Sequence, residues 1–456
     1  MLFGSTDFID QKGKARLASE HGWTPMNSLE GFILDLRWDD LPEKTRQTLR
    51  TCILDTIGCA VAGSGSEQLP THVGTLLEQK QHGENPVWGT RFNLNPGWSI
   101  FFNAHNAAYY DLDDGHRRAQ GHPGATIIPA ALGTAYHLGL SGKDFLEAVV
   151  VGYEVAIRSA LVIRELGGPR KGSGGWAIVG AAAATARLMC SSHEQVLHAI
   201  GLAEYYAPQA PQDRSVVFPS EMKEGIPWGA YAGYTSAMLA SGGFSGMRPY
   251  LADSPYIADL GATYEIEKTY FKQYSSCRWA HPALDALTQI LAENRRAAET
   301  ISEIRVFSFE KAVLMQRCAP ATSMEAVYSI PFAVGCYLVH GELGPQQLSE
   351  NNLHNPEILA LARRVKMIAD PELTACFPEQ CLQRVEVDFN TGETCCSPLV
   401  SAKGDPDNPY TEDELIDKFT WLTSEILGSQ AEQIPPLIRD LERHSVADLV
   451  KLLIPE

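Results

Sequence analysis

The segment LPEKTRQTLRTCILDTIGCAVAG (Leu41–Gly63) indicates the fold class, because its apolar residues recur at the spacing of a helix. Leu49, Ile53 and Ile57 fall on one face of that helix, and Gly63 is expected to end it. Two later stretches, GATIIPAALGTAYHLGLSG (124–142) and VGAAAATARLMCSS (179–192), are rich in small residues, which let helices approach closely. From about residue 29 to 245 the sequence therefore predicts a buried bundle of successive helices.

After about residue 263 the character of the sequence changes. SEIRVFSF (302–309) and QRVEVDFNTGETCCS (383–397) alternate in the manner of strands, and Asn390-Thr391-Gly392 predicts the turn of a hairpin. Between them, EAVYSIPFAVGCYLVHG (325–341) predicts a helix that Pro331 starts or kinks. TEDELIDKFTWLTSEIL (411–427) and SVADLVKLLI (445–454) are helical again.

The length of 456 residues is too great for one ordinary domain and predicts two domains or one with an insertion. We expect a mainly α fold, in which residues 1–264 and 406–456 together form an all-helical domain. Residues 265–405 would then form a smaller, inserted α+β domain.

The charge balance restricts the partners of the protein. It has 37 Lys and Arg against 55 Asp and Glu, a net charge of −18 at pH 7, which is the opposite of what a nucleic-acid binder shows. An acidic substrate would need local Lys and Arg to reverse this field inside a cleft. The apolar runs are interrupted before they reach the length of a membrane span, and the N-terminus lacks the features of a secretory leader. The ten cysteines are scattered without a paired CxxC motif, so we expect a cytoplasmic protein.

Acids, bases and imidazoles crowd into YYDLDDGHRRAQGHPGA (109–125), between two apolar helices. This loop, with Asp111, His116, Arg117 and His122, is a good place for acid/base chemistry. A solvated helix linker, in which His122 only caps the next helix, is the alternative. Binding of a divalent cation by the three aspartates at 111, 113 and 114 is a further alternative, which the neighbouring arginines disfavour.

A second group of reactive residues lies in FKQYSSCRWAHPALDAL (271–287), where the helical region gives way to the strands. Clefts for small molecules tend to lie at domain junctions. Arg278 suits bidentate contact with a carboxylate, and Lys272 suits a point-charge contact. The alternative is an ordinary helix start with Cys277 in the core. Lys223, in SEMKEGIPWGAY (220–231), is a lone cation whose alternative is a surface lysine.

In these blocks the sequence resembles the 2-methylcitrate dehydratase (MmgE/PrpD) superfamily. The matching blocks are LDTIGCAVAGS (54–64), DLDDGHRRAQGHPGATIIPAAL (111–132), LSGKDFLEAVVVGYEVAIR (140–158) and KQYSSCRWAHPALDA (272–286). They keep their order, and the resemblance covers nearly everything from about residue 29 to 438. It implies a large helical domain from both chain ends, a smaller α+β lid domain and a homodimer. We expect the lid domain to move over the site and exclude water.

The resemblance also implies a cofactor-free enzyme without a metal, acting on a small di- or tricarboxylic acid. The family includes 2-methylcitrate dehydratase, cis-aconitate decarboxylase and iminodisuccinate epimerase. Asp111, His122, Lys223, Lys272 and the position of Cys277 match its active-site pattern.

Carbon acids of this kind are weak, so proton transfer needs a positioned base and cationic groups beside it. Our hypothesis is that Lys223, Lys272 and Arg278 hold substrate carboxylates while His122, held by Asp111, moves the proton. His281, His116 and Arg117 are the further candidates for substrate contact.

Three departures from the family bear on the reaction. Gly115 stands where relatives carry Thr, Gly174 or Gly175 where some carry His, and Cys277 where some carry His. His116 and Arg117 are candidates to compensate for these losses. We expect a 2-methylcitrate dehydratase-like lyase. Because an epimerase needs only removal and return of a proton, it is the alternative. A catalytically inactive polycarboxylate-binding member is a second alternative.

Overall fold

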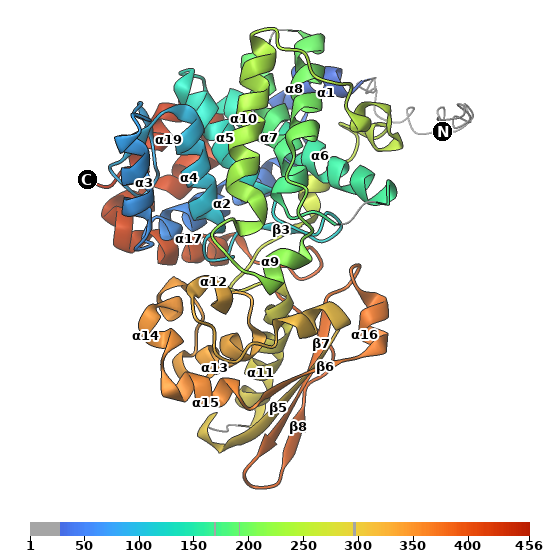
Figure 1. The fold of residues 1–456 in the computed structure, drawn as a ribbon, viewed down its shortest axis with the longest axis vertical. Coiled ribbons are helices and arrows are strands. Elements are labelled where there is room, and N and C mark those ends of the chain that lie inside the picture. The colour runs from blue at the N-terminus through green and yellow to red at the C-terminus, as the bar shows by residue number, and fades with distance from the viewer. Residues whose placement is uncertain (1–27, 168–169, 191, 295–297) are drawn as a thin grey trace.

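The computed structural model describes residues 28–456 except 168–169, 191 and 295–297. It consists of a larger helical part and a smaller part that carries the main sheet (Figure 1). The N-terminal stretch in which no secretory leader is expected lies outside the described residues, and so do two positions of the Gly-rich stretch 167–175.

The helices of the larger part come from both ends of the chain, as Figure 1 shows by its blue-to-green and red segments. The N-terminal ones are α1 (Leu29–Asp35), α2 (Glu43–Gly63), α3 (Leu69–Glu78), α4 (Pro96–Ala108), α5 (Gly124–His137), α6 (Gly142–Glu165), α7 (Gly174–Met189), α8 (His193–Tyr206), α9 (Asp213–Val217) and α10 (Ile226–Ser241). The C-terminal ones are α17 (Glu412–Leu427), α18 (Ile434–Arg439) and α19 (Val446–Leu452). Two short strands, β1 (Asn85–Pro86) and β2 (Asn93–Leu94), pair beside α4.

Local sequence explains where several of these helices begin. Ser141 and Asp144 form a reciprocal capping box at the start of α6. Thr411 and Glu414 do the same for α17. The predicted helix of residues 41–63 is confirmed as α2, which ends at Gly63. A Cβ atom at Gly63 would lie 2.0 Å from the Asn106 carbonyl oxygen, so α2 and α4 approach too closely for any side chain there.

Small residues bring α6 and α7 into direct contact in the centre of the larger part. A Cβ atom at Gly180 of α7 would lie 2.3 Å from the Gly152 carbonyl oxygen of α6. The buried apolar cluster around this crossing contains residues from Leu29 to Phe271 and from Phe419 to Leu453. The two ends of the chain therefore share one core.

The smaller part contains the predicted strands and hairpin. Its helices are α11 (His281–Asn294), α12 (Ser323–Ala326), α13 (Ile330–His340), α14 (Glu350–Leu353), α15 (Pro356–Ala362) and α16 (Pro371–Cys376). Its strands are β5 (Ile301–Ser308), β6 (Val365–Ala369), β7 (Leu382–Phe389), β8 (Thr394–Cys396) and β9 (Val400–Ser401). The sheet order is β6-β5-β7-β8, with β6 parallel to β5, β7 antiparallel to β5 and β9 pairing with β7.

The sheet carries its own buried cluster. Alternate residues of β5 and β7 are buried, and Val216 joins a core otherwise formed by residues 274–400. Gly392 adopts φ +84° in the turn between β7 and β8, as the Asn-Thr-Gly signal requires. Pro331 lies in the first turn of α13 and starts this helix without kinking it.

The expected mainly α architecture is thus confirmed, while the domain boundaries at 264/265 and 405/406 and the lid motion stay predictions. Among the residues that the structure describes, no helix has the length and apolar character that a bilayer crossing needs. The two parts meet where β3 (Gly115–His116) pairs antiparallel with β4 (Thr269–Tyr270). This pairing brings the residue 109–125 loop beside the residue 271–287 segment.

The close contact between α6 and α7 can be tested by adding a methyl group at Gly180. Gly180→Ala should lower the free energy of unfolding by about 1–3 kcal/mol, because the added methyl group overpacks the helix crossing. Gly74→Ala in α3 is the control, since a Cβ atom there meets nothing within 4 Å. This control should raise the free energy of unfolding by up to about 1 kcal/mol, through helix propensity. Urea denaturation followed by circular dichroism measures both, and a wild-type midpoint for Gly180→Ala would contradict the packing argument.

Candidate active site

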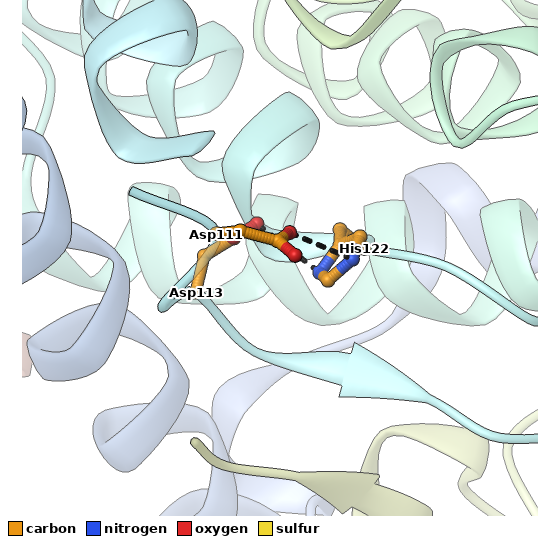
Figure 2. A group of neighbouring side chains, drawn as sticks. All are labelled: Asp111, Asp113 and His122. Carbon is orange, nitrogen blue, oxygen red and sulfur yellow. Dashed lines mark ion pairs between the residues drawn. The ribbon is translucent and has the colours of Figure 1, made fainter. Parts of the chain in front are cut away.

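A tight turn of three buried aspartates follows α4. Asp111 adopts φ +52°, a left-handed conformation that is uncommon for residues other than Gly. The side chains of Asp111, Asp113 and Asp114 are all buried. Backbone strain of this kind persists only where the surroundings hold it, and it tends to occur at functional sites. Figure 2 shows the Asp111 carboxylate next to the imidazole of His122.

Main-chain contacts fix the His122 ring. Nδ1 lies 2.7 Å from the Asp114 carbonyl oxygen, and the backbone N–H donates to Ser173 Oγ at 3.0 Å. Since a carbonyl oxygen only accepts, Nδ1 carries the proton of the neutral ring, and Nε2 is the bare nitrogen. Nε2 lies 3.6 Å from Asp111 Oδ1. The ring is thus set up as a base whose protonated form faces a carboxylate.

Asp111 receives its hydrogen bonds from Lys272 instead of from His122. The Lys272 ammonium donates to the Asp111 carbonyl oxygen at 2.7 Å and lies 3.1 Å from Asp111 Oδ1. Burial raises the pKa of this carboxyl, but Lys272, Lys223 and His122 together hold it well below its usual range. The Asp114 carbonyl group contacts the ring at Nδ1, Ser173 holds the His122 backbone, and Asp111 faces Nε2. The hypothesis that Asp111 holds His122 stays a prediction.

The other two aspartates differ from Asp111. Neither carboxylate oxygen of Asp113 has a hydrogen-bond partner, although Oδ2 lies 3.4 Å from His122 Nδ1, and burial raises its pKa. Asp114 accepts from the Tyr153 hydroxyl at 2.5 Å and from the Gly124 N–H at 3.0 Å. Burial raises the pKa of Asp114 to about 7.

Lys223 is a buried cation without a hydrogen-bonding partner. Its side-chain nitrogen is sequestered from solvent and lies 5.2 Å from the centre of the Tyr328 ring. The short helix that it begins, Lys223–Gly225, has φ of +41°, +56° and +77° at its three residues. Ser173 holds this strained turn, because its N–H and hydroxyl donate to Glu224 Oε2 at 3.1 and 2.7 Å. The same serine therefore positions both His122 and the Lys223 turn.

A pocket opens between the two parts of the molecule beside these groups. The larger part contributes Asp111, His116, Arg117, Gln120, His122, Gln212 and Glu224, and the other side contributes Tyr270, Cys277, Arg278, Trp279, Tyr328, Phe377 and Cys381. Lys223 and Lys272 lie directly behind this lining, through Tyr328 and Asp111. Of the nine residues predicted as site residues, six thus line the pocket, and the ammonium groups of Lys223 and Lys272 contact its lining.

Arg278 and Arg117 are in the pocket wall, but protein groups engage them. The Arg278 guanidinium donates to the carbonyl oxygens of Phe271, Ala402 and Lys403 and pairs with Asp405 at 2.9 Å. Arg117 pairs with the other oxygen of Asp405. Arg278 therefore links segments at the domain junction through its hydrogen bonds. Sequence analysis instead expects its guanidinium group to be available for a substrate carboxylate.

Protein groups also contact the ring nitrogens of the two remaining histidines, His116 and His281. His116 lines the pocket, but its Nδ1 accepts from the Ala119 N–H at 3.1 Å and its Nε2 lies 3.4 Å from Glu265 Oε2. His281 does not line the pocket. Its Nε2 lies 3.2 Å from the Ser276 carbonyl oxygen, and burial holds its pKa well below the usual range.

Cys277 lines the pocket as a neutral thiol. Burial, and then the Asp111 carboxylate, raise the pKa of its thiol, so it is not an activated nucleophile.

Sequence reasoning missed Ser173, Glu224 and Tyr328. Ser173 lies in a Gly-rich stretch, where a serine is unremarkable, and Tyr328 lies in an apolar helix start. Only Glu224 could have been suspected from the sequence, because it directly follows the candidate residue Lys223.

The donor atoms of Asp111, Asp113 and His122 lie within 4.8 Å of one another, a spacing that is compatible with a metal ion. However, the Lys272 ammonium already neutralises Asp111, so the cluster is poorly suited to a divalent cation.

The buried Asp114 carboxyl generates a prediction about pH. Its raised pKa means that the folded protein keeps a proton that the unfolded chain releases near its ordinary value of about 3.9. The stabilising contribution is therefore complete below that value and is lost as pH rises towards about 7. Asp114→Asn cannot ionise and should flatten the fall in the free energy of unfolding over this range. Urea denaturation across pH measures this, with exposed Asp39→Asn as control, and equal slopes for Asp114→Asn and wild type would contradict it.

Comparison with known proteins places the chain in a family. Residues 27–259 match the MmgE/PrpD N-terminal domain, and residues 274–443 match the MmgE/PrpD C-terminal domain.

Three curated relatives match most of the chain. The chain is 24% identical over 470 residues to cis-aconitate decarboxylase of Aspergillus terreus, and the match covers 92% of this chain and 93% of that protein. It is 23% identical to the cis-aconitate decarboxylase-like protein oryM of Aspergillus oryzae, over 93% of this chain and 96% of that protein. It is 24% identical to 2-methylcitrate dehydratase of Cupriavidus necator, over 72% of this chain and 74% of that protein. The chain therefore belongs to the MmgE/PrpD family.

Proposed function

We propose that this protein is a cofactor-independent lyase that acts on a small di- or tricarboxylic acid. The observation that carries the proposal is that His122, whose Nε2 carries no proton in the neutral ring, lines a pocket behind whose wall the buried cation Lys223 lies without a hydrogen-bond partner. The names of the decarboxylase and dehydratase relatives support the reaction class. Elimination of water from a 2-methylcitrate-like acid is the reaction that we favour.

Lys223 supplies the recognition of the substrate. A buried ammonium ion without a hydrogen-bonding partner costs free energy, and a substrate carboxylate would supply the missing acceptor. Lys272 adds positive charge behind Asp111, although its own hydrogen bonds are already made within the protein. Both cations would also stabilise the negative charge that develops when a proton leaves the carbon next to a carboxylate.

His122 would move the proton. Nε2 takes the proton from the carbon, the electron pair of that C–H bond forms the new double bond, and the C–O bond to the hydroxyl breaks. The imidazolium then gives its proton to the departing hydroxyl, which leaves as water. Asp111, 3.6 Å away, stabilises the imidazolium between these two events. Because one ring serves both events, proton and hydroxyl would leave from the same face of the substrate.

An epimerase of an iminodisuccinate-type acid is the second candidate. A Cβ atom at Gly174 would lie 2.0 Å from the Gly225 carbonyl oxygen, so no imidazole can take that position in this chain. An epimerisation has no leaving group and so needs fewer proton donors than an elimination. The absence of an imidazole at Gly174 therefore favours the epimerase. An inactive polycarboxylate-binding protein is the remaining alternative.

Assembly and location follow as further proposals. Met222, Trp228 and Met238 are exposed on and next to α10, and the Trp228 ring stacks on Tyr231 at 5.6 Å. Exposed apolar patches of this kind mark contact surfaces, so we propose a homodimer through this face. The ten cysteines are scattered without a paired CxxC motif, which supports a reducing, cytoplasmic location.

The first test is turnover. Proton NMR in deuterated water with 2-methylcitrate, citrate, cis-aconitate and iminodisuccinate distinguishes the reactions. Loss of water or carbon dioxide supports a lyase, and the product identifies which. Deuterium entry without other change supports the epimerase. Binding of these acids without turnover would support the inactive alternative and contradict the proposal.

His122→Gln should reduce kcat by about 10²–10⁴-fold, because glutamine keeps polar contacts but cannot take up a proton at neutral pH. His137→Gln, at the exposed far end of α5, is the matched control and should turn over normally. Thermal unfolding of both variants checks that the fold is retained. Near-normal turnover by a folded His122→Gln variant would exclude this ring as the base.

Lys223→Met should raise KM by about 10-fold or more and also lower kcat, because the ammonium contacts a carboxylate in the bound substrate and in the transition state. Methionine has nearly the same length and removes only the charge. The control is Lys171→Met, in the loop that precedes α7. An unchanged kcat/KM in Lys223→Met would refute the proposed carboxylate contact.

A further inference from the structure

A third buried lysine contacts the aspartate turn from the C-terminal end of the chain. The side chain of Lys418, in α17, is 10% exposed. Its ammonium lies 2.5 Å from Asp55 Oδ1 of α2 and donates to the carbonyl oxygen of Leu112 at 2.9 Å. Leu112 is the residue between Asp111 and Asp113. The catalytic chemistry proposed above does not use Lys418.

Leu112 is held at its side chain as well as at its carbonyl group. Its side chain is buried in a small apolar cluster with Cys59 and Ala62 of α2 and Leu422 of α17. The same two helices thus supply both the apolar packing and the hydrogen bond. This leaves the peptide at the centre of the turn little freedom to rotate.

The packing of α17 on α2 also fixes Lys418. A Cβ atom at Gly58 would lie 3.0 Å from the ring of Phe419, the neighbour of Lys418, so the two helices meet at close range. Burial lowers the pKa of Lys418, but Asp55 outweighs this and raises it, which keeps the side chain as an ammonium ion. The donor to Leu112 is therefore both charged and rigidly placed.

Three carbonyl groups of the turn each have a side-chain partner, and two of these partners come from distant segments. Lys272 donates to that of Asp111, Lys418 to that of Leu112, and the His122 ring to that of Asp114. A turn that begins with a left-handed Asp cannot satisfy these groups by itself. The orientation of the last carbonyl, which sets the tautomer of His122, thus depends on the first two.

We propose that Lys418 is a positioning residue: by holding the Leu112 carbonyl group, it sets the peptide orientation through which Asp114 fixes the Nδ1-protonated form of His122. This inference deepens the proposed function and rests on it. Lys418 acts through the turn and does not touch the substrate.

The surroundings of Lys418 make chemical rescue feasible. It lines a second cavity of about 420 Å³ at the domain junction, together with Lys403, Tyr410 and Trp421. In Lys418→Ala, the space left by the side chain would adjoin this cavity, so a small primary ammonium ion can reach it. Lys403 lines the same cavity but pairs with Glu414 and makes no contact with the aspartate turn, which makes it the matched control.

We expect Lys418→Ala to lower kcat by about 100-fold with KM within about twofold, since a displacement of the turn misplaces the base. Ethylammonium should restore a measurable part of kcat. Tetramethylammonium, which has the charge but no N–H donor, should not. Lys403→Ala should behave as wild type. Wild-type kcat in a folded Lys418→Ala variant, or equal rescue by tetramethylammonium, would overturn the inference.

A second readout does not need turnover. Nitrogen-15 NMR of labelled histidine side chains reports the tautomer of His122, assigned by the loss of its signals in His122→Gln. Wild type should show the Nδ1-protonated form, and Lys418→Ala a mixture that ethylammonium shifts back. If no acid is turned over but this change occurs, the proposed function fails and the positioning role stands. An unchanged tautomer would overturn the positioning role itself.

Should Lys418→Ala fail to fold, Asp55→Asn provides the same test with the lysine in place. It removes the carboxylate that anchors the ammonium and keeps the shape of the side chain. Loss of kcat with unchanged KM, together with a mixed His122 tautomer, would support the inference. Wild-type values for both would overturn it.

Discussion

The compensation of buried charge at the turn of residues 111–114 is the constraint on which the rest of the structure depends. A carboxylate that is removed from water costs several kcal/mol unless charged or hydrogen-bonding partners replace the water. Lys272 from the domain junction pairs with Asp111, and Tyr153 from α6 donates to Asp114. Each partner comes from a different segment, so the turn is stable only when the helices from both ends of the chain and the junction have assembled. The site is therefore a product of the complete fold and not of the loop alone.

The same reasoning applies to the acidic substrate that we propose for this acidic protein. The net charge of −18 gives an unfavourable mean field, so the cleft must be locally positive. In the pocket wall, the carboxylates of Asp111, Glu224 and Asp405 outnumber the guanidinium groups of Arg117 and Arg278 by one. The buried Lys223 and Lys272, directly behind this wall, turn the balance into one net positive charge. The two arginines thus contribute positive charge to the pocket and also stabilise the domain junction. Because both pair with Asp405, neither guanidinium group is available for bidentate contact with a substrate carboxylate.

Periodicity predicted the mainly helical architecture, α2, the β7–β8 hairpin and the start of α13, because each is a local pattern of apolar spacing and turn residues. It could not predict partners. That Lys272 bonds to Asp111, and that the Asp114 carbonyl group orients His122, depends on where distant segments meet. Family resemblance pointed to Asp111, His122 and Cys277, which line the pocket, and to Lys223 and Lys272, which lie behind it. It did not reveal that protein carbonyl groups already occupy Arg278, since the same side chain can bind a ligand or tie two segments together.

The departures from the family acquire a physical meaning in this geometry. A Cβ atom at Gly115 would lie 2.3 Å from the hydroxyl oxygen of Tyr270, its partner across the β3–β4 pair. The phenol thus occupies the space that a side chain at position 115 would need, and it lines the pocket. Burial raises the pKa of Tyr270 well above its usual range, so it remains a hydrogen-bond donor that does not release its proton. A donor of this kind can stabilise a departing hydroxyl while His122 supplies the proton. In the proposed elimination, Tyr270 would therefore take the place of the threonine hydroxyl that the family resemblance implies at Gly115. The imidazole that it implies at Gly174 or Gly175 has no room in this chain, because a Cβ atom would lie 2.0 or 2.7 Å from a carbonyl oxygen there.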